Sequence, residues 1–296
     1  MSEQSETAAP ARRSGGLGPR LVRLVSKGFL QAVLIVIALV WLVPTLGLAL
    51  ASLRSLQDNN SGGWWTVFTK PSQLTLDNYG NLLENDTIRD GFLNTIYITL
   101  PATFLVVAIS ALAAYAFAWL DFPGRDWLFL VVVGLLVVPI QIGLIPLAKM
   151  FGAIGIFGSV TGVVLYHVAF GLPFAIFLLR NFFAAIPASL LEAARIDGGR
   201  DWTIFFRVIL PLGLPAIASL AIFQFLWVWN DLLIALIFAD RGAQPLTVAL
   251  QQQTRSFGSS LDVIATGSFL SLIVPLVVFF AFQRYFVQGV LAGSVK

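Results

Sequence analysis

The 296-residue sequence contains no cysteine and only one histidine, His167. Without cysteine the chain can form neither disulfides nor thiolate metal sites. One histidine leaves almost no material for a metal centre or for a nucleophile–base pair. No lysine stands in a Gly-x-x-x-x-Gly-Lys pattern, so the chain has no P-loop for ATP hydrolysis. We therefore expect a protein that is not an enzyme and that binds no metal or cofactor of its own.

Charged residues are scarce as well. They make up only 11% of the sequence, whereas a soluble domain carries about 25%. The formal net charge of +3 is too small to indicate a nucleic-acid partner. Apolar residues are abundant instead, at 58% of the chain with a mean hydropathy of +0.87. Most of this chain must therefore face lipid or other buried helices.

Six apolar runs are each long enough to cross a bilayer, which takes about 20 residues as a helix. Lipid cannot satisfy a free backbone N–H or C=O, and the runs are too long and too uniformly apolar for barrel strands. We predict an all-α integral membrane protein in which residues 29–296 form the membrane domain and residues 1–28 a mobile tail. The six transmembrane helices are expected at about residues 29–53, 92–119, 127–148, 159–180, 209–238 and 263–283.

The distribution of Lys and Arg indicates the orientation. If the N-terminus is cytoplasmic, the inside carries twice as many of these residues as the outside, as the positive-inside rule requires. Both termini and the polar segment around Glu192 are then cytoplasmic. A signal peptide is the competing interpretation of the N-terminus, because Ala49-Leu50-Ala51 resembles a cleavage site. The apolar run before it is longer than the roughly 7–15 residues of a signal peptide, which favours a retained helix.

A polar segment separates the fourth and fifth runs. Ser189 and Glu192 have the spacing of a capping box, which predicts a helix over about Leu190–Ile196, roughly two turns long. Asp197-Gly198-Gly199 should end this helix, and Asp201 should cap the next one. A short rod with a glycine corner can transmit force from a partner outside the membrane. The same pattern also fits an amphipathic helix that only lies on the membrane surface.

Several motifs resemble a known family. Glu192-Ala193-Ala194, Asp197-Gly198 and Ile209-Leu210-Pro211 resemble the EAA motif of permease subunits of ATP-binding-cassette importers. One departure is Gly199, where many relatives have alanine, and we expect it to loosen the corner slightly. Over about residues 29–296 the chain resembles the second, six-span permease of maltose-type sugar importers. The flanking matches are Leu76-Asp77-Asn78-Tyr79, Phe92-Leu93-Asn94-Thr95, Trp229-Asn230-Asp231 and the stretch from Gln283 to Gly289.

The resemblance implies a type I importer permease fold in a bacterial or archaeal cytoplasmic membrane, with a cytoplasmic coupling helix between spans four and five. It implies inward movement of a sugar or oligosaccharide by alternating access. The implied partners are a second permease subunit, two ATPase subunits that bind ATP and Mg, and an external solute-binding protein. The implied ATPase contacts are Glu192, Ala193, Ala194, Arg195, Asp197 and Gly198 in the coupling helix, with Gln288, Gly289 and Lys296 near the C-terminus.

Polar residues inside the spans are the candidates for the transport pathway. Asp231, beside Asn230, is costly in a membrane, and we favour a structural or gating role for it. Gln224 is a better candidate for sugar contact, because an amide suits hydroxyl partners. His167 has no acidic neighbour on its own span, which favours a packed histidine over a proton relay. An importer of a non-sugar solute and a stand-alone channel or carrier remain the alternatives.

Overall fold

The computed structural model describes residues 17–257 and 261–292, and apart from two isolated β-bridges all regular structure in these ranges is helical. Helix α1 (Leu17–Ser52) begins ahead of residue 29, so part of the predicted tail is helical. Its segment Gly28–Ser52 is long and apolar enough to cross a membrane. The chain divides into two units, one ending at Leu48 and one beginning at Ala49. The second unit contains all the elements described next.

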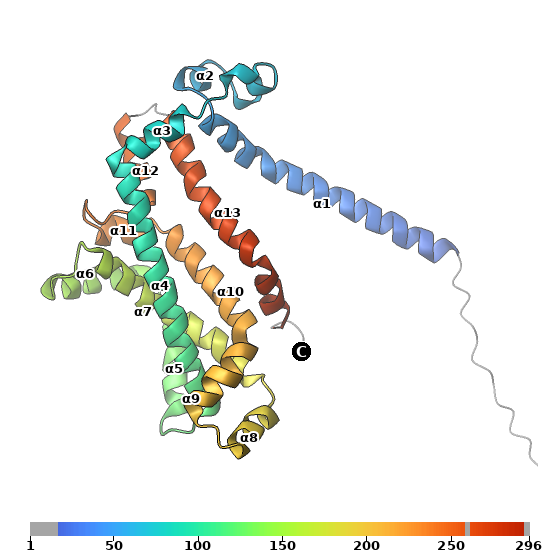
Figure 1. Cartoon of the computed structure of the whole chain (residues 1–296), viewed down its shortest axis with the longest axis vertical. Helices are drawn as coiled ribbons and strands as arrows, with labels where there is room; N and C mark the ends of the chain where they lie inside the picture. Colours follow the sequence, from blue (N-terminus) through green and yellow to red (C-terminus); the bar gives the residue numbers. More distant parts are fainter. Residues whose placement is uncertain (1–16, 258–260, 293–296) are drawn as a thin grey trace, which may run out of the picture. The chain divides into compact units, whose positions relative to one another are not determined.

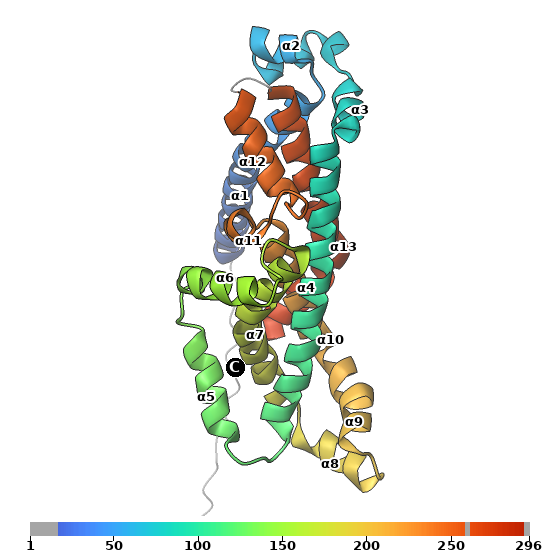
Figure 2. The ribbon, with the colours of Figure 1, turned by 90° about the vertical axis from the view of Figure 1, so that its left-hand side faces the viewer.

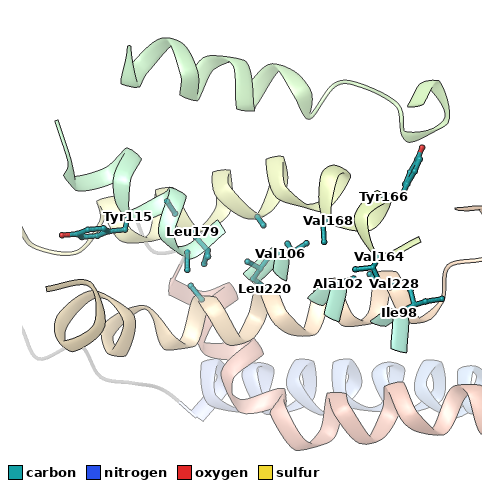
Figure 3. Close-up of a cluster of buried hydrophobic side chains, with 14 of the residues drawn as sticks. Ile98, Ala102, Val106, Tyr115, Val164, Tyr166, Val168, Leu179, Leu220 and Val228 are labelled. Carbon is teal, nitrogen blue, oxygen red and sulfur yellow. The ribbon is translucent and has the colours of Figure 1, made fainter. Parts of the chain in front are cut away.

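Four long helices form the core of the second unit (Figures 1 and 2). They are α4 (Asp86–Trp119), α7 (Val160–Ala184), α10 (Leu210–Trp229) and α13 (Leu261–Ala292). Helix α4 packs most extensively against α7, and α10 packs against α13 and α4. Buried alanines on α4, among them Ala102 and Ala114, let neighbouring backbones approach closely. Figure 3 shows Val106 of α4, Val168 of α7 and Leu220 of α10 meeting in the resulting apolar cluster.

The third predicted span is not one straight helix. Helix α5 (Arg125–Leu135) is followed by a 3-10 turn, η3 (Ile140–Gly143), and by α6 (Leu144–Ala153), and the two parts are bent by 96°. Pro139 stands at the bend, and a proline disfavours helical geometry in the residue before it. Within the described ranges, five helices are long and apolar enough to span a membrane, or six if this bent pair is one span.

The fifth predicted span is also interrupted. Helix α10 ends at Trp229, and a separate helix, α11 (Leu233–Phe238), follows after a short break. Helix α12 (Leu246–Phe257) then packs against α4 and α13. The polar residues Asn230 and Asp231 therefore lie at a junction between helices and not within one continuous helix.

A compact segment connects residue 53 to α4 at the opposite end of the second unit from the Glu192 region (Figure 2). Arg54 is fully buried at its centre and donates to the carbonyl oxygens of Asp58 (2.7 Å) and Gly62 (3.2 Å) and to Oγ1 of Thr66 (3.1 Å). The backbone is thus folded around one guanidinium group. The elements of the segment are α2 (Leu56–Ser61), two 3-10 turns, η1 (Trp64–Phe68) and η2 (Pro71–Gln73), and α3 (Asp77–Glu84).

Candidate functional site

The short helix between α7 and α10 is present as α8 (Ala188–Ile196), but it begins earlier than predicted. Pro187 is the residue that precedes its first turn, and its carbonyl oxygen accepts a hydrogen bond from the N–H of Leu190 (3.1 Å). No side chain caps this end, so the predicted capping box between Ser189 and Glu192 is wrong. Both residues lie inside the helix, which places Leu191, only 2% exposed, against the core of the bundle. Burial of this leucine outweighs the local capping preference.

The predicted end of α8 is confirmed, and its geometry is a complete Schellman motif. Gly198 has a φ of 81°, in the left-handed region that glycine adopts without a Cβ penalty. Its N–H donates to the carbonyl of Arg195 (3.0 Å), and the N–H of Gly199 donates to that of Ala194 (2.9 Å). A Cβ on Gly199 would lie 2.7 Å from the same Ala194 oxygen. The expectation that Gly199 loosens the corner is therefore wrong, because glycine permits this close approach.

A hydrogen-bond chain fixes α8 to the ends of two long helices. Arg195 donates through Nη2 to the carbonyl of Trp119 (3.3 Å), one of the last carbonyls of α4, which have no partner within their own helix. The indole N–H of Trp119 in turn donates to the carbonyl of Phe183 in α7 (3.0 Å). Arg195 therefore has a partner within its own chain. Sequence reasoning missed this contact because it joins residues 76 positions apart.

The segment after the corner is also fixed to α4. Asp201 was expected to cap the next helix, but it is the first residue of α9 (Asp201–Ile204), and no side chain caps that helix. Its carboxylate instead accepts the hydroxyl hydrogen of Tyr115 on α4 (Oη–Oδ1 3.3 Å). The carboxylate is thus used for tertiary contact, and α9 is tied to the bundle at its first residue.

Helix continues without a break from α9 into α10. The two are joined by a π-helical turn, η4 (Phe205–Ile209), in which Leu210 donates to the carbonyl of Phe205. Pro211 follows at the start of α10 and has no N–H to donate to the turn before it. A wider turn is a common way to accommodate such a change inside a helix. The corner at Gly198 is therefore followed by one continuous helical rod that reaches Trp229.

The outer surface of α8 is open. Glu192, Ala193, Asp197 and Gly198 are exposed, and Ala194 is half-buried against the core. Ile196 is 86% exposed, so a large apolar side chain also stands on this open surface. Of the other predicted contacts, Gln288 and Gly289 belong to α13, but their surroundings lie outside what the structure describes, as does Lys296 altogether.

A second polar arrangement surrounds Asp231. Its carboxylate accepts from the backbone N–H groups of Ile234 (3.3 Å) and Ala235 (3.0 Å), so it satisfies donors at the start of α11. Its own carbonyl accepts from the hydroxyl of Thr247 on α12 (2.6 Å). Asn230, next to it, donates to the carbonyl of Leu226 in α10 (2.8 Å). Asp231 thus joins α11 to α12, whereas the hydrogen bond that the Asn230 side chain makes within the described residues stays in its own turn.

His167 lies beside this junction. Its Nε2 is 3.6 Å from Oδ2 of Asp231, and its ring packs edge-on against Trp227 with centroids 5.1 Å apart. As expected from the sequence, α7 itself carries no acidic residue, but the carboxylate of Asp231 approaches His167 from the junction between α10 and α11. Two ligands do not make a metal centre, and the described residues contain no group of three His, Asp or Glu side chains that could hold a metal.

Asp231→Ala is expected to lower the free energy of unfolding by about 1–2 kcal/mol, because two backbone N–H groups of α11 lose their acceptor. Asp231→Asn is the comparison variant: asparagine keeps one of the two acceptor oxygens and removes the charge, and we expect a smaller loss. Thermal unfolding of the purified variants in detergent measures the difference. An equal loss in both would contradict the expectation that one capping oxygen preserves part of the stabilisation.

Comparison with known proteins adds to this geometry. Residues 105–292 match the family described as "Binding-protein-dependent transport system inner membrane component". The match extends over α8, the corner and the helices on either side of them. The α8 segment and the residues around Asp231 therefore both lie within the part of the chain that matches the family.

Two relatives are similar over most of this chain. The first is the Osmoprotective compounds uptake permease protein GgtD of Synechocystis sp., with 50% identity over 89% of this chain and 90% of that protein. The second is the Alpha-glucoside transport system permease protein AglG of Rhizobium meliloti, with 48% identity over 77% of this chain and 62% of that protein. The structure also resembles a bacterial ABC transporter involved in import of the acidic polysaccharide alginate. That match has a TM-score of 0.74 and 23% identity, over 92% of this chain and 98% of the other.

Proposed function

Because the chain belongs to the family of binding-protein-dependent transport system inner membrane components and is a permease subunit of an ATP-binding-cassette importer, we propose that its solute is a sugar or an oligosaccharide. The relative named for alpha-glucoside transport supports this choice. The relative named for osmoprotective compounds supports a second candidate, a small compatible solute that need not be a sugar.

The observation that carries the mechanism is the exposed, rigidly capped helix α8. Glu192 and Ile196 are free to enter a cleft on a partner, while Leu191 and the Arg195 bond hold the other side of α8 to the bundle. A load applied to α8 passes through the corner at Gly198 and the anchored Asp201 into the continuous helix that ends at Trp229. In the proposed mechanism, closure of two ATPase subunits around ATP and Mg moves α8 and thereby tilts α10.

The membrane arrangement that fits this mechanism has α8 and both termini in the cytoplasm, in agreement with the excess of Lys and Arg on that side. The bent pair α5 and α6 then counts as one of six spans. The segment around Arg54 lies outside, on the side from which a solute-binding protein delivers the solute. A second, different permease subunit completes the pathway. Residues Gln288, Gly289 and Lys296 are proposed as additional ATPase contacts.

Reconstitution tests this proposal. The chain, purified from its native membrane with the subunits that accompany it, is placed in liposomes with its binding protein, ATP and a panel of radiolabelled solutes. We expect ATP-dependent uptake of a di- or oligosaccharide and no uptake without ATP. Uptake of a non-sugar osmoprotectant alone would favour the second candidate. ATP-independent flux through the isolated chain would contradict the importer assignment altogether.

A further inference from the structure

A cavity of about 290 Å³ opens between α7 and α10. It lies close to the apolar cluster of Figure 3, since Leu220 of that cluster is one of its lining residues. Four aromatic rings line it, two from each helix, together with a glycine and an amide side chain. These residues are Phe170, Gly171, Phe174, Phe223, Gln224 and Trp227. Ligand sites commonly combine apolar and aromatic walls with a few polar groups that fix orientation.

Gln224 is the polar group of this cavity. Its side chain is only 5% exposed, and its Nε2 has no hydrogen-bond partner among the described residues. A buried N–H without an acceptor is unfavourable, and such a group is normally paired with protein, water or ligand. A solute hydroxyl can accept from the amide nitrogen and can also donate to the amide oxygen, so it satisfies either end of this side chain.

Gly171 determines where the amide lies. A Cβ at this position would be 2.9 Å from Nε2 and 3.0 Å from Oε1 of Gln224, and 3.0 Å from Cγ2 of Val106. The amide therefore packs directly against the backbone of α7, in space that any other residue would fill. The missing side chain of Gly171 positions the polar group at the wall of the cavity.

Three of the rings around the amide are partly exposed. Phe174 is 47% exposed, Phe223 42% and Trp227 38%. Exposed rings alone would suit lipid, but a face turned to lipid gains nothing from a buried, unpaired amide. A pyranose ring matches both features, because its C–H face packs on aromatic rings while its hydroxyls meet the amide. At about 290 Å³ the cavity is at the small end of ligand sites, which suits one sugar ring.

We propose that Gln224, with the rings of Phe174, Phe223 and Trp227, forms a subsite for one sugar ring of the transported solute. The proposal rests on the assignment of this chain as a sugar-importer permease and adds that this chain itself contacts the solute. It assigns the α7–α10 face to the translocation pathway. Gly171 is a positioning residue that holds the amide in the subsite.

The absence of cysteine in the sequence permits a direct test. Phe223→Cys in the complete complex is labelled with a methanethiosulfonate reagent, with and without a sugar that the wild-type complex transports. We expect that sugar to slow labelling at least about fivefold and a non-transported sugar to have no effect. Val277→Cys on α13, where the native side chain is 61% exposed, is the control and should be unaffected by either sugar. If the transported sugar does not change the labelling rate of Phe223→Cys, the proposed subsite is wrong.

Gln224→Leu supplies a second readout. We expect sugar uptake to fall at least about tenfold while ATP hydrolysis stimulated by the binding protein is retained, and Gly171→Ala to lower uptake in the same way by displacing the amide. Unchanged uptake in Gln224→Leu would overturn the subsite but leave the importer assignment standing. Absence of ATP-driven sugar uptake in the wild-type complex would instead contradict the proposed function. If Gln224→Leu does not assemble, the labelling result decides, since that experiment retains Gln224.

Discussion

Replacing Gly198 with valine is expected to reduce ATP hydrolysis by the assembled importer about tenfold when it is stimulated by the binding protein. A left-handed backbone costs an L-residue about 1–2 kcal/mol, and a β-branched residue tolerates it worst. With a φ of 81° at Gly198, the corner would relax and α8 would lose its fixed direction relative to α10. A cost of about 1.4 kcal/mol lowers the equilibrium constant for forming the correct corner tenfold. The rate of phosphate release in proteoliposomes measures the effect.

Gly124 provides a matched control. It has a φ of 80°, and, as at Gly198, a Cβ there would meet nothing within 4 Å, so the two substitutions impose the same backbone strain in open space. Gly124 lies in the turn between α4 and α5, outside the segment that joins α8 to α10. Gly124→Val should change the stimulated rate by no more than about twofold, because its strain falls outside the connection between α8 and α10. Equal losses at both glycines would mean that any strained turn damages the protein, and the specific role of the corner would be refuted.

The glycine corner could be predicted from the sequence because its cause is local. Two consecutive glycines favour a helix stop, because glycine disfavours the helix interior and adopts the left-handed conformation of a helix end without a Cβ penalty. The capping box at Ser189 was equally plausible by local rules and was wrong. Leu191, two residues on, is buried in the bundle, and the helix starts where that burial requires. Local sequence patterns therefore predict the ends of a helix best where burial of a nearby apolar side chain does not shift them.

Proline positions did not reveal which spans are broken. Pro101, Pro173 and Pro215 lie inside helices that continue through them, whereas Pro139 stands at a bend of 96°. The difference depends on whether neighbouring helices hold both halves in line, which a single sequence does not show. The sequence did not show the interruption at Asp231 either, because a carboxylate at such a position can be a pathway residue or a helix cap.

The contacts that unite the candidate site are long-range. Arg195 to Trp119 and Asp201 to Tyr115 join residues 76 and 86 positions apart, and His167 meets Asp231 from a different helix. Hydrophobic periodicity identifies which face of a helix is apolar but not which helix lies opposite. In a chain this uniformly apolar, periodicity does not clearly distinguish the buried face of a helix from its other faces. The sequence could therefore indicate which polar residues matter, but not which residues they contact.

Replacing Arg54 with leucine is expected to lower stability more than any other substitution proposed for this chain. The guanidinium group of Arg54 is fully buried and bonds to two backbone carbonyls, to Oγ1 of Thr66 and to Oδ1 of Asn59. Arg54→Leu removes all these donors at once, and the half-buried Gly62 carbonyl and Asn59 Oδ1 lose the bonds that this group donates to them. Hydrogen bonds to charged groups contribute about 1.5–3 kcal/mol each and are not additive. We expect the free energy of local opening in residues 55–76 to fall by at least about 3 kcal/mol.

Amide hydrogen exchange of this segment measures that change, since a fall of about 3 kcal/mol accelerates exchange through local opening more than 100-fold. The exchange rate of Arg54→Lys should lie between those of the wild type and Arg54→Leu, because one ammonium group cannot donate to all the acceptors that the guanidinium group reaches.

Arg89→Leu is the matched control: the side chain of Arg89 is 51% exposed and pairs with Asp86 and Asp90 at the surface. Such exposed pairs contribute at most about 1 kcal/mol, so exchange should change less than about tenfold. If Arg54→Leu accelerates exchange no more than Arg89→Leu does, the buried guanidinium is not what holds this segment together. The fold around it would then depend on the hydrogen bonds that Asn78 donates to the carbonyls of Ser52 and Arg54, at 2.9 and 2.8 Å, which the substitution leaves in place.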